Sequence, residues 1–377
     1  MPARIEDDVR GPRGGGSGEG TAARAAGGYG PADFEVPDET AMLIREAVPE
    51  NTATAYRSRW QSFETWCARA GRVPVPATAQ TVAAYLTCLA AGRGLKATTV
   101  DAHLTAIRAV HRGAGAAVPD GLTARKVVVA AQRREAARDG RYGPRRAVPV
   151  MASGLPAIAA ACDTATAAGL RDRAVVLLGF ALLARRSELA ALSLSDVELA
   201  SEGLAVTIRS SKTDQAARGV TRRIHYAANE AVCPVRAVLA WTAFLAASGI
   251  TAGPLFTRID RWGNLGTGAG GRYGRPRDGR LRPQAVGEII ASLCESAVPA
   301  SAGPGAVAAG PDAVAGERRG YSGHSLRRGG ATSMLKAGAQ PLNVSRHGRW
   351  TDGSRSFSGY VEEATGFGDA NPTQGLL

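Results

Sequence analysis

The sequence predicts a mainly α-helical protein of two domains, with a small β-sheet in the second domain. Three observations predict this arrangement. Apolar residues recur at helical spacing from about residue 39 to 135, two short runs near residues 204–209 and 221–226 have strand character, and a basic stretch broken by Gly and Pro separates the two regions. A chain of 377 residues is long enough for about two domains, each with its own core.

Residues 39–135 are expected to form a helical module. Its apolar positions fall into three groups, each on one helical face: Trp60, Phe63 and Cys67; Val82, Tyr85, Leu86 and Leu89; Leu104, Ile107 and His111. Basic residues alternate with these positions, so they should face outward, where phosphates could be met: Arg57, Arg59, Lys96, Arg108 and Arg112. Taken singly, each is better explained as a solvated surface charge.

The flanks of this module have the composition of connecting segments. Residues 1–38 lack apolar periodicity and are expected to be a disordered tail. Residues 136–150 are polar, basic and interrupted by Gly and Pro, which predicts a basic linker in which Arg145 and Arg146 are further phosphate-binding candidates.

Residues 151–365 are expected to form the second, α+β domain, followed by a C-terminal tail at 366–377. Helices are predicted through Ile158, from Arg173 to Leu183, and at about 234–247 and 283–296. The two strands flank a connection that contains Lys212. Irregular stretches at 258–282 and 299–316 are interpreted as a loop facing a partner and a disordered insertion.

Charge and cysteine content limit the class of protein. The net charge of +13 implies a polyanionic partner, with nucleic acid the leading candidate, although an inert basic surface explains composition alone equally well. The five cysteines are scattered, without CxxC pairs or zinc-ligand spacing, so we expect reduced thiols and no metal. No signal-like apolar run begins the sequence and no membrane-length apolar stretch occurs, which predicts a cytoplasmic protein without membrane contact.

Six residues form a set suited to attacking a phosphodiester without a metal or other cofactor: Arg185, Lys212, His324, Arg327, Trp350 and Tyr360. Two guanidiniums can grip the non-bridging phosphate oxygens and neutralise charge in a pentacoordinate transition state. A phenol is scarcely ionised at neutral pH, so Tyr360 needs a proton acceptor, for which His324 is suited. A protonated Lys212 can supply a proton to the leaving oxygen, and the indole of Trp350 offers one N–H donor.

Each residue alone is more readily explained as an ordinary surface or core residue. The specificity lies in the conjunction of RxSEL after an apolar helix, SKTD between strands, His-Ser-Leu-Arg-Arg-Gly opening a helix, and a late tyrosine. In this combination and order the sequence resembles the tyrosine recombinase (phage integrase) family over about residues 45–365.

The resemblance implies a helical core-binding domain and a catalytic domain of the tyrosine recombinase type. It implies that the six residues take the family's catalytic positions, with Glu188 in a supporting role. Tyr360 would attack the scissile DNA phosphate, leaving a 3′-phosphotyrosyl bond and a free 5′-hydroxyl that can attack a partner strand. The implied partners are double-stranded DNA and further copies of the chain, as a homotetramer on DNA. Accessory factors that bend DNA or set direction remain open.

One spacing departs from the family pattern. Ten positions separate Trp350 from Tyr360, whereas nine is common in the family, which predicts one extra residue in the loop 351–355. His347 therefore competes with Trp350 for the sixth catalytic position. The Gly348-Arg349-Trp350 setting favours Trp350.

Three functions remain open from the sequence. A site-specific recombinase or integrase should form a covalent adduct with DNA through Tyr360. A non-catalytic DNA-binding protein on the same scaffold would bind without forming an adduct. A type IB topoisomerase-like enzyme would relax supercoiled plasmid that lacks any special site. The separate helical module and the filled catalytic positions favour the recombinase. The target sequence and the biological task, whether phage integration, transposition or chromosome resolution, are not readable.

Overall fold

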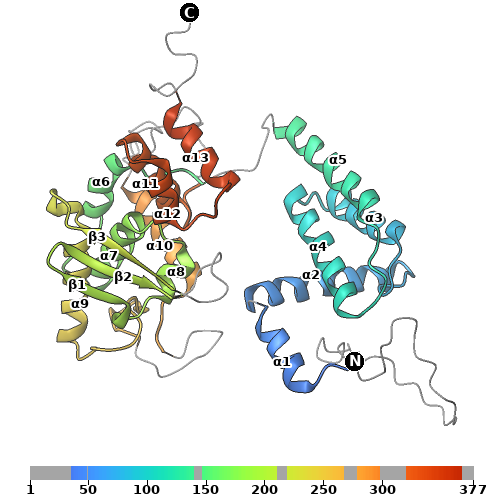
Figure 1. The fold of residues 1–377 in the computed structure, drawn as a ribbon, viewed down its shortest axis with the longest axis horizontal. Coiled ribbons are helices and arrows are strands. Elements are labelled where there is room, and N and C mark those ends of the chain that lie inside the picture. Colours follow the sequence, from blue (N-terminus) through green and yellow to red (C-terminus); the bar gives the residue numbers. More distant parts are fainter. Residues whose placement is uncertain are drawn as a thin grey trace, which may run out of the picture. The chain divides into compact units, whose positions relative to one another are not determined.

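The computed structural model describes residues 35–48, 50–139, 147–209, 219–266, 278–297 and 320–366. The chain divides into two compact units, residues 1–144 (unit 1) and 145–377 (unit 2) (Figure 1). The predicted class, mainly helical with a small sheet, is confirmed.

Unit 1 is helical throughout its described elements: α1 (Asp38–Glu46), α2 (Glu50–Arg69), α3 (Ala79–Thr87), a π-helical turn η3 (Cys88–Gly92), α4 (Ala97–Gly113) and α5 (Gly121–Asp139). The three apolar faces that the sequence indicates on α2, α3 with η3, and α4 are buried in one core, which α5 joins through Ala124 and Val128. Helix α5 continues through Asp139, so the segment between the units is shorter at this end than the expected linker.

Two histidines lie inside this core. His111 is fully buried, accepts a hydrogen bond from the Ala77 N–H at Nε2 (2.9 Å) and contacts the Ile107 carbonyl through Nδ1 (2.8 Å). Because a carbonyl can only accept, the proton sits on Nδ1 and the ring is neutral. His103 lies 3.1 Å from the hydroxyl of Tyr85. Burial, followed by repulsion from Arg59 and Arg93, lowers the pKa of His103 to about 4.

Unit 2 combines helices with a small antiparallel sheet: η4 (Ala152–Gly154), α6 (Leu155–Ala160), α7 (Ala167–Ala181), α8 (Arg186–Ala191), η5 (Leu194–Asp196), β1 (Val197–Ala200), β2 (Gly203–Ile208), β3 (Val220–His225), η6 (Glu230–Val232), α9 (Pro234–Ala247), α10 (Pro283–Ser296), α11 (Ser325–Lys336), α12 (Pro341–Gly348) and α13 (Arg355–Thr365). Figure 1 shows the sheet at one side of the unit and α11, α12 and α13 together at another.

Within the described residues the sheet has the order β1-β2-β3, and β1 was not predicted. Its partner β2 alternates buried and half-buried residues, whereas β1 is half-buried at Val197 and exposed afterwards. An edge strand that buries one face weakly lacks the alternation that a sequence pattern can detect. Antiparallel pairing with β2, in which Val197 lies opposite Val206, holds β1 in place.

The core of unit 2 surrounds α7, which is buried along most of its length and packs against α9 and α11. Residues 147–150, expected to belong to the linker, are joined to this unit, since the N–H groups of Val148 and Val150 donate to the carbonyls of Gly320 and Ser325. Among the helices that the structure describes, none has the length and apolarity needed to cross a membrane.

Candidate active site

The site begins where α7 ends and α8 starts. After α7 the backbone turns at Leu183, a non-glycine residue with a φ of 50°, and Arg185 then caps α8. The Arg185 N–H donates to Glu188 Oε2 (2.8 Å), as in a capping box. The left-handed conformation of Leu183 is disfavoured for a branched residue, so tertiary contacts must hold this turn. Arg185 therefore projects from the break between α7 and α8.

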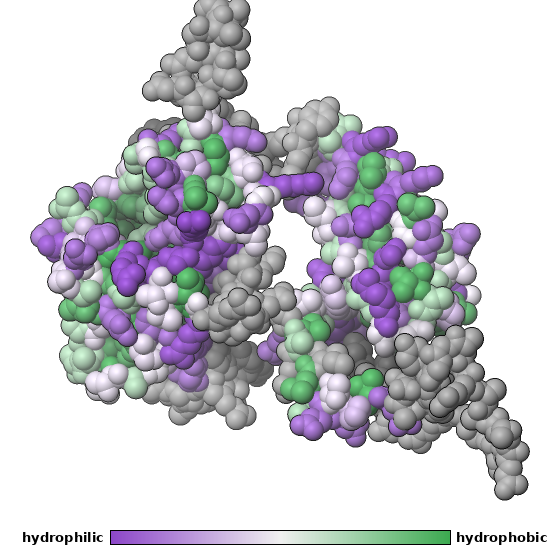
Figure 2. All heavy atoms as spheres, viewed as in Figure 1, coloured by the Kyte–Doolittle hydropathy of each residue, from purple (hydrophilic) through white to green (hydrophobic). Residues whose placement is uncertain are grey.

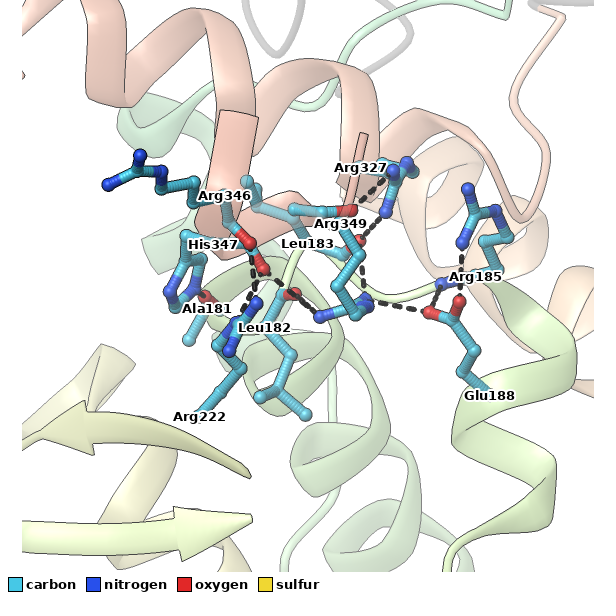
Figure 3. Close-up of polar contacts among 11 residues, drawn as sticks. Ala181, Leu182, Leu183, Arg185, Glu188, Arg222, Arg327, Arg346, His347 and Arg349 are labelled. Atoms are coloured by element: carbon cyan, nitrogen blue, oxygen red, sulfur yellow. Dashed lines mark hydrogen bonds and ion pairs between the residues drawn. The ribbon is translucent and has the colours of Figure 1, made fainter. Parts of the chain in front are cut away.

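Glu188 is the acidic centre of the site. Its side chain is 2% exposed, and its carboxylate accepts hydrogen bonds from Arg185 Nη1 (2.6 Å) and from Arg349 Nη2 (2.7 Å) (Figure 3). Burial alone would raise the pKa of Glu188, but Arg349 and the backbone and guanidinium of Arg185 outweigh it and lower the pKa. The carboxylate is therefore ionised and holds two arginines at once.

Arg327 enters the same site from α11. It is 3% exposed and donates through Nη1 to the carbonyl of Leu183 (2.5 Å) and through Nη2 to that of Gly348 (2.6 Å). Burial, then the positive charges of Arg185 and Arg349, lowers the pKa of Arg327 to about 9. Arg327 thus stays protonated at neutral pH, although the positive charges of Arg185 and Arg349 repel its guanidinium.

Trp350 and Tyr360 complete this side of the site. The guanidinium of Arg327 lies 3.8 Å from the centre of the Trp350 ring, and Tyr360 packs edge-on against the same ring at 5.6 Å between centroids. Trp350 can fold back in this way because Gly348 has no side chain; a Cβ there would collide with the indole. Tyr360 lies on α13, half-buried on a small apolar cluster with Phe357 and Val344.

His324 and Lys212 are placed less completely. His324 is the N-terminal cap of α11, one helical turn before Arg327, and its side chain is exposed. Lys212 lies outside the described residues, between the end of β2 at Ile208 and the start of β3 at Val220. The structure therefore brings together four of the six predicted residues around Glu188 and the Trp350 ring: Arg185, Arg327, Trp350 and Tyr360.

His347, the competitor for the sixth position, points elsewhere. Its Nε2–H donates to the carbonyl of Ala181 (2.8 Å), and the ring lies near Arg222 (Figure 3). Burial, offset in part by this hydrogen bond, lowers the pKa of His347. Of the two candidates, Trp350 is the one in contact with Arg327 and Tyr360.

The phosphate-binding candidates of unit 1 differ in exposure. Arg57, Lys96 and Arg112 are exposed as expected, and Arg59 is half-buried. Arg108 is also half-buried and donates to the carbonyl of Pro119 (3.3 Å), so part of its guanidinium serves an internal contact rather than a free outward face. Arg145 and Arg146 lie outside the described residues.

Three further arginines belong to the site's framework and were not singled out from the sequence. Arg349 binds Glu188. Arg222 on β3 donates to the carbonyls of Arg346 and His347 at the end of α12. Arg328 pairs with Glu363 on α13 (2.8 Å), one helical turn beyond Tyr360. Arginine is common in this chain, so only the spatial convergence separates these residues from surface charges.

Part of the surface of unit 2 is hydrophilic. Figure 2 shows hydrophilic residues gathered on the displayed face over α12 and the neighbouring end of the sheet. Among the described residues no group of His, Cys, Asp and Glu is arranged to hold a metal ion. Apart from Glu188, the charged groups described at the site are arginines, which can bind anions.

The chain is 29% identical over 332 residues to the integrase/recombinase XerD homolog of Selenomonas ruminantium, covering 86% of this chain and 85% of the relative. It is 23% identical over 314 residues to the recombinase Cre of Escherichia phage P1, covering 82% of this chain and 83% of that protein. No family model matches.

Among solved structures, a lambda integrase (75–356) dimer bound to a COC′ core site aligns with a TM-score of 0.51 and 14% identity, over 85% of this chain and 92% of that chain. This likeness concerns the fold. Two recombinases match over most of their length and an integrase shares the fold, which supports the predicted resemblance to the tyrosine recombinase (phage integrase) family.

Proposed function

We propose that this protein is a site-specific DNA recombinase that cuts and rejoins strands through a 3′-phosphotyrosyl intermediate. The observation that carries the proposal is an imbalance of charge. Among the described residues, Arg185 and Arg349 bind one carboxylate, Glu188, and Arg327 lies within its electrostatic influence, beside the ring pair that contains Tyr360. This leaves about two positive charges for an anion, which matches a phosphodiester on its way to a pentacoordinate state.

Other buried charges in the described part of unit 2 are matched one to one. Arg171 pairs with Asp172 (2.7 Å) and Asp196 with Arg209 (2.5 Å). The unmatched cluster is therefore a local feature and not a general property of this basic chain. Because unmatched buried charge is costly, its presence favours a functional role.

Two arginines are suited to hold the phosphate. Arg327 uses two of its five N–H groups on backbone carbonyls, which leaves three for phosphate oxygens. Arg185 is anchored to Glu188 through Nη1 and retains the other donors of its fork. Fixed donors of this kind need little reorganisation when charge develops in the transition state.

The proposed reaction conserves bonds and protons. The oxygen of Tyr360 attacks phosphorus while its proton passes to His324. The bond to the 5′-oxygen breaks, and that oxygen takes a proton from Lys212. The products are a 3′-phosphotyrosyl link and a 5′-hydroxyl. Rejoining reverses these steps with a 5′-hydroxyl of a partner strand, so the bond energy is kept without a nucleotide cofactor.

In this proposal Trp350 fills the sixth position, donating its indole N–H to a phosphate oxygen. Its contacts with Arg327 and Tyr360 support this, while His347 is bound to the carbonyl of Ala181. Unit 1 would grip the duplex with exposed basic residues such as Arg57 and Arg112, and the active form would be a tetramer on DNA. We place this activity in the cytoplasm, where DNA is accessible.

The test uses a pool of DNA duplexes of random sequence, each with a nick at a fixed position. A nick lets the cleaved end diffuse away, so the covalent complex accumulates. We expect an adduct that survives denaturation, and sequencing its DNA identifies the cleaved site. Tyr360→Phe should form none. An adduct with Tyr360→Phe would show that another residue is the nucleophile, and binding without any adduct would favour a non-catalytic DNA-binding protein.

A further inference from the structure

Arg349 occupies a backbone position that glycine would suit better. It follows α12 and has a φ of 60°, in the left-handed region. For a residue with a Cβ this conformation is disfavoured, because the Cβ lies too close to the following carbonyl oxygen. Glycine adopts it without that clash, and most helices that end in this way use glycine. An arginine here needs a compensating contribution from its side chain.

The side chain of Arg349 is 5% exposed and contacts the end of α7 and the buried carboxylate on α8. Its Nη1 donates to the carbonyls of Leu182 (3.2 Å) and His347 (3.1 Å). Its Nη2 donates to Glu188 (2.7 Å) and, over a longer distance, to the carbonyl of Leu183 (3.4 Å). One guanidinium thus ties the end of α7, the start of α8 and the end of α12 (Figure 3).

Two of these partners are shared with the phosphate-binding arginines. Glu188 also binds the guanidinium of Arg185, and the Leu183 carbonyl also accepts from Arg327. Leu183 itself has a disfavoured φ of 50°. Arg349 is therefore placed to fix both the carboxylate that orients Arg185 and the carbonyl that orients Arg327.

A role limited to capping α12 does not explain these contacts. Arg222 on β3 already donates to the carbonyls of Arg346 and His347 at the end of that helix. The left-handed turn after the helix requires no guanidinium. The short bond from Arg349 to Glu188 goes instead to a carboxylate on another helix.

We propose that Arg349 is a positioning residue that sets the spacing and orientation of Arg185 and Arg327 through Glu188 and the Leu183 carbonyl. This inference rests on the proposed function. Arg349 does not touch the phosphate; it acts through groups that do. Losing it should slow the chemical step and leave DNA affinity unchanged, because misplacement of catalytic groups by about 1 Å can cost on the order of 100-fold in rate.

The experiment uses the full-length protein and a nicked duplex carrying the site selected by the wild type. Single-turnover adduct formation gives the cleavage rate, and gel-shift titration on the intact duplex gives Kd at fixed salt. Arg349→Gly is the main variant, since it removes the guanidinium and relaxes the backbone. Arg346→Ala is the matched control: it removes one positive charge from the same helix end, where its side chain is exposed.

We expect Arg349→Gly to cleave about 100-fold more slowly with Kd within about twofold of the wild type. Arg346→Ala should cleave within about twofold. An Arg349→Gly rate equal to that of the wild type would overturn the inference. Absence of an adduct with the wild type would instead overturn the proposed function, so the two failures are distinguishable.

The double variant Arg349→Gly/Glu188→Gln guards against loss of folding. Removing Arg349 alone leaves the buried Glu188 charge with one partner fewer, which should lower the unfolding temperature, and neutralising Glu188 should restore it in part. We expect the double variant to remain slow. Recovery of the wild-type cleavage rate would mean that Arg349 only neutralises Glu188, and positioning would be refuted.

Discussion

The two units bury polar side chains in opposite ways. In unit 1, the buried His103 and His111 are neutral and hydrogen-bonded within the core. In unit 2, the site buries Arg327, Arg349 and Glu188 as charged groups, and positive charge is in excess. Neutral histidines whose hydrogen bonds are satisfied contribute to a stable core, whereas positive charge without a matching carboxylate can bind an anionic ligand. The comparison teaches that burial of polar groups indicates function only when their charges or hydrogen bonds are incomplete.

The largest expected effect is on the cleavage rate, when an arginine of the cluster around Glu188 is removed. Arg327→Ala should reduce the rate of adduct formation by on the order of 1,000-fold, because it removes fixed donors from the developing charge. Lys336→Ala, which removes an exposed charge from the last turn of the same helix, is the control. Single-turnover cleavage of the nicked duplex measures both. Equal rates for both variants would mean that the charge excess is not catalytic.

In unit 1, replacing a buried polar side chain should lower the free energy of unfolding and leave the cleavage rate unchanged. His111→Ala leaves the Ala77 N–H and the Ile107 carbonyl without their partner and opens a cavity, which should cost about 3 kcal/mol. Calorimetry of the whole chain should show a lower transition for unit 1 and an unchanged one for unit 2. Destabilisation of both transitions would contradict the independence of the two cores.

The stability of the two units should also differ in its dependence on acid pH. The pKa of His103 is about 4 in the fold, below its ordinary value of 6.5, so the unfolded chain binds the proton more readily between these values. Its contribution to stability is present above about pH 6.5 and is lost as the pH falls toward 4. At pH 5 unit 1 should lose about 2 kcal/mol relative to pH 7.

Urea unfolding followed at both pH values measures this loss. His103→Gln, which cannot titrate in this range, should flatten the pH dependence of unit 1. A variant that remains as acid-sensitive as the wild type would assign the effect to other groups.

The smallest expected effect is stabilisation of unit 2 by a simple anion. Inorganic phosphate at about 20 mM, binding with a Kd of about 1 mM, should add on the order of 1–2 kcal/mol to unit 2 and little to unit 1. Calorimetry against chloride at equal ionic strength measures the difference. Arg327→Ala should remove it, and an equal gain in both units would show only a general salt effect.

Much of the fold could be predicted from the sequence because it follows local periodicity. The apolar faces predicted on α2, α3 and α4 are buried in the core of unit 1, and α9 and α10 have the predicted bounds. The edge strand β1 was missed because three of its four residues are exposed. The end of α5 was misplaced, since Asp139 sits in a polar stretch that resembles a linker.

The site divides in the same manner. The identities of the reacting groups can be predicted from the sequence, because an arginine, a tryptophan or a tyrosine has its donors and acceptors whatever its surroundings. Which arginines share Glu188, that Trp350 lies between Arg327 and Tyr360, and that Arg349 joins the framework follow from the packing of the helices. Hydrogen-bond partners 161 residues apart, such as Arg349 and Glu188, are set by how α7, α8 and α12 pack. No local pattern encodes that distance, because packing depends on all the surfaces that meet.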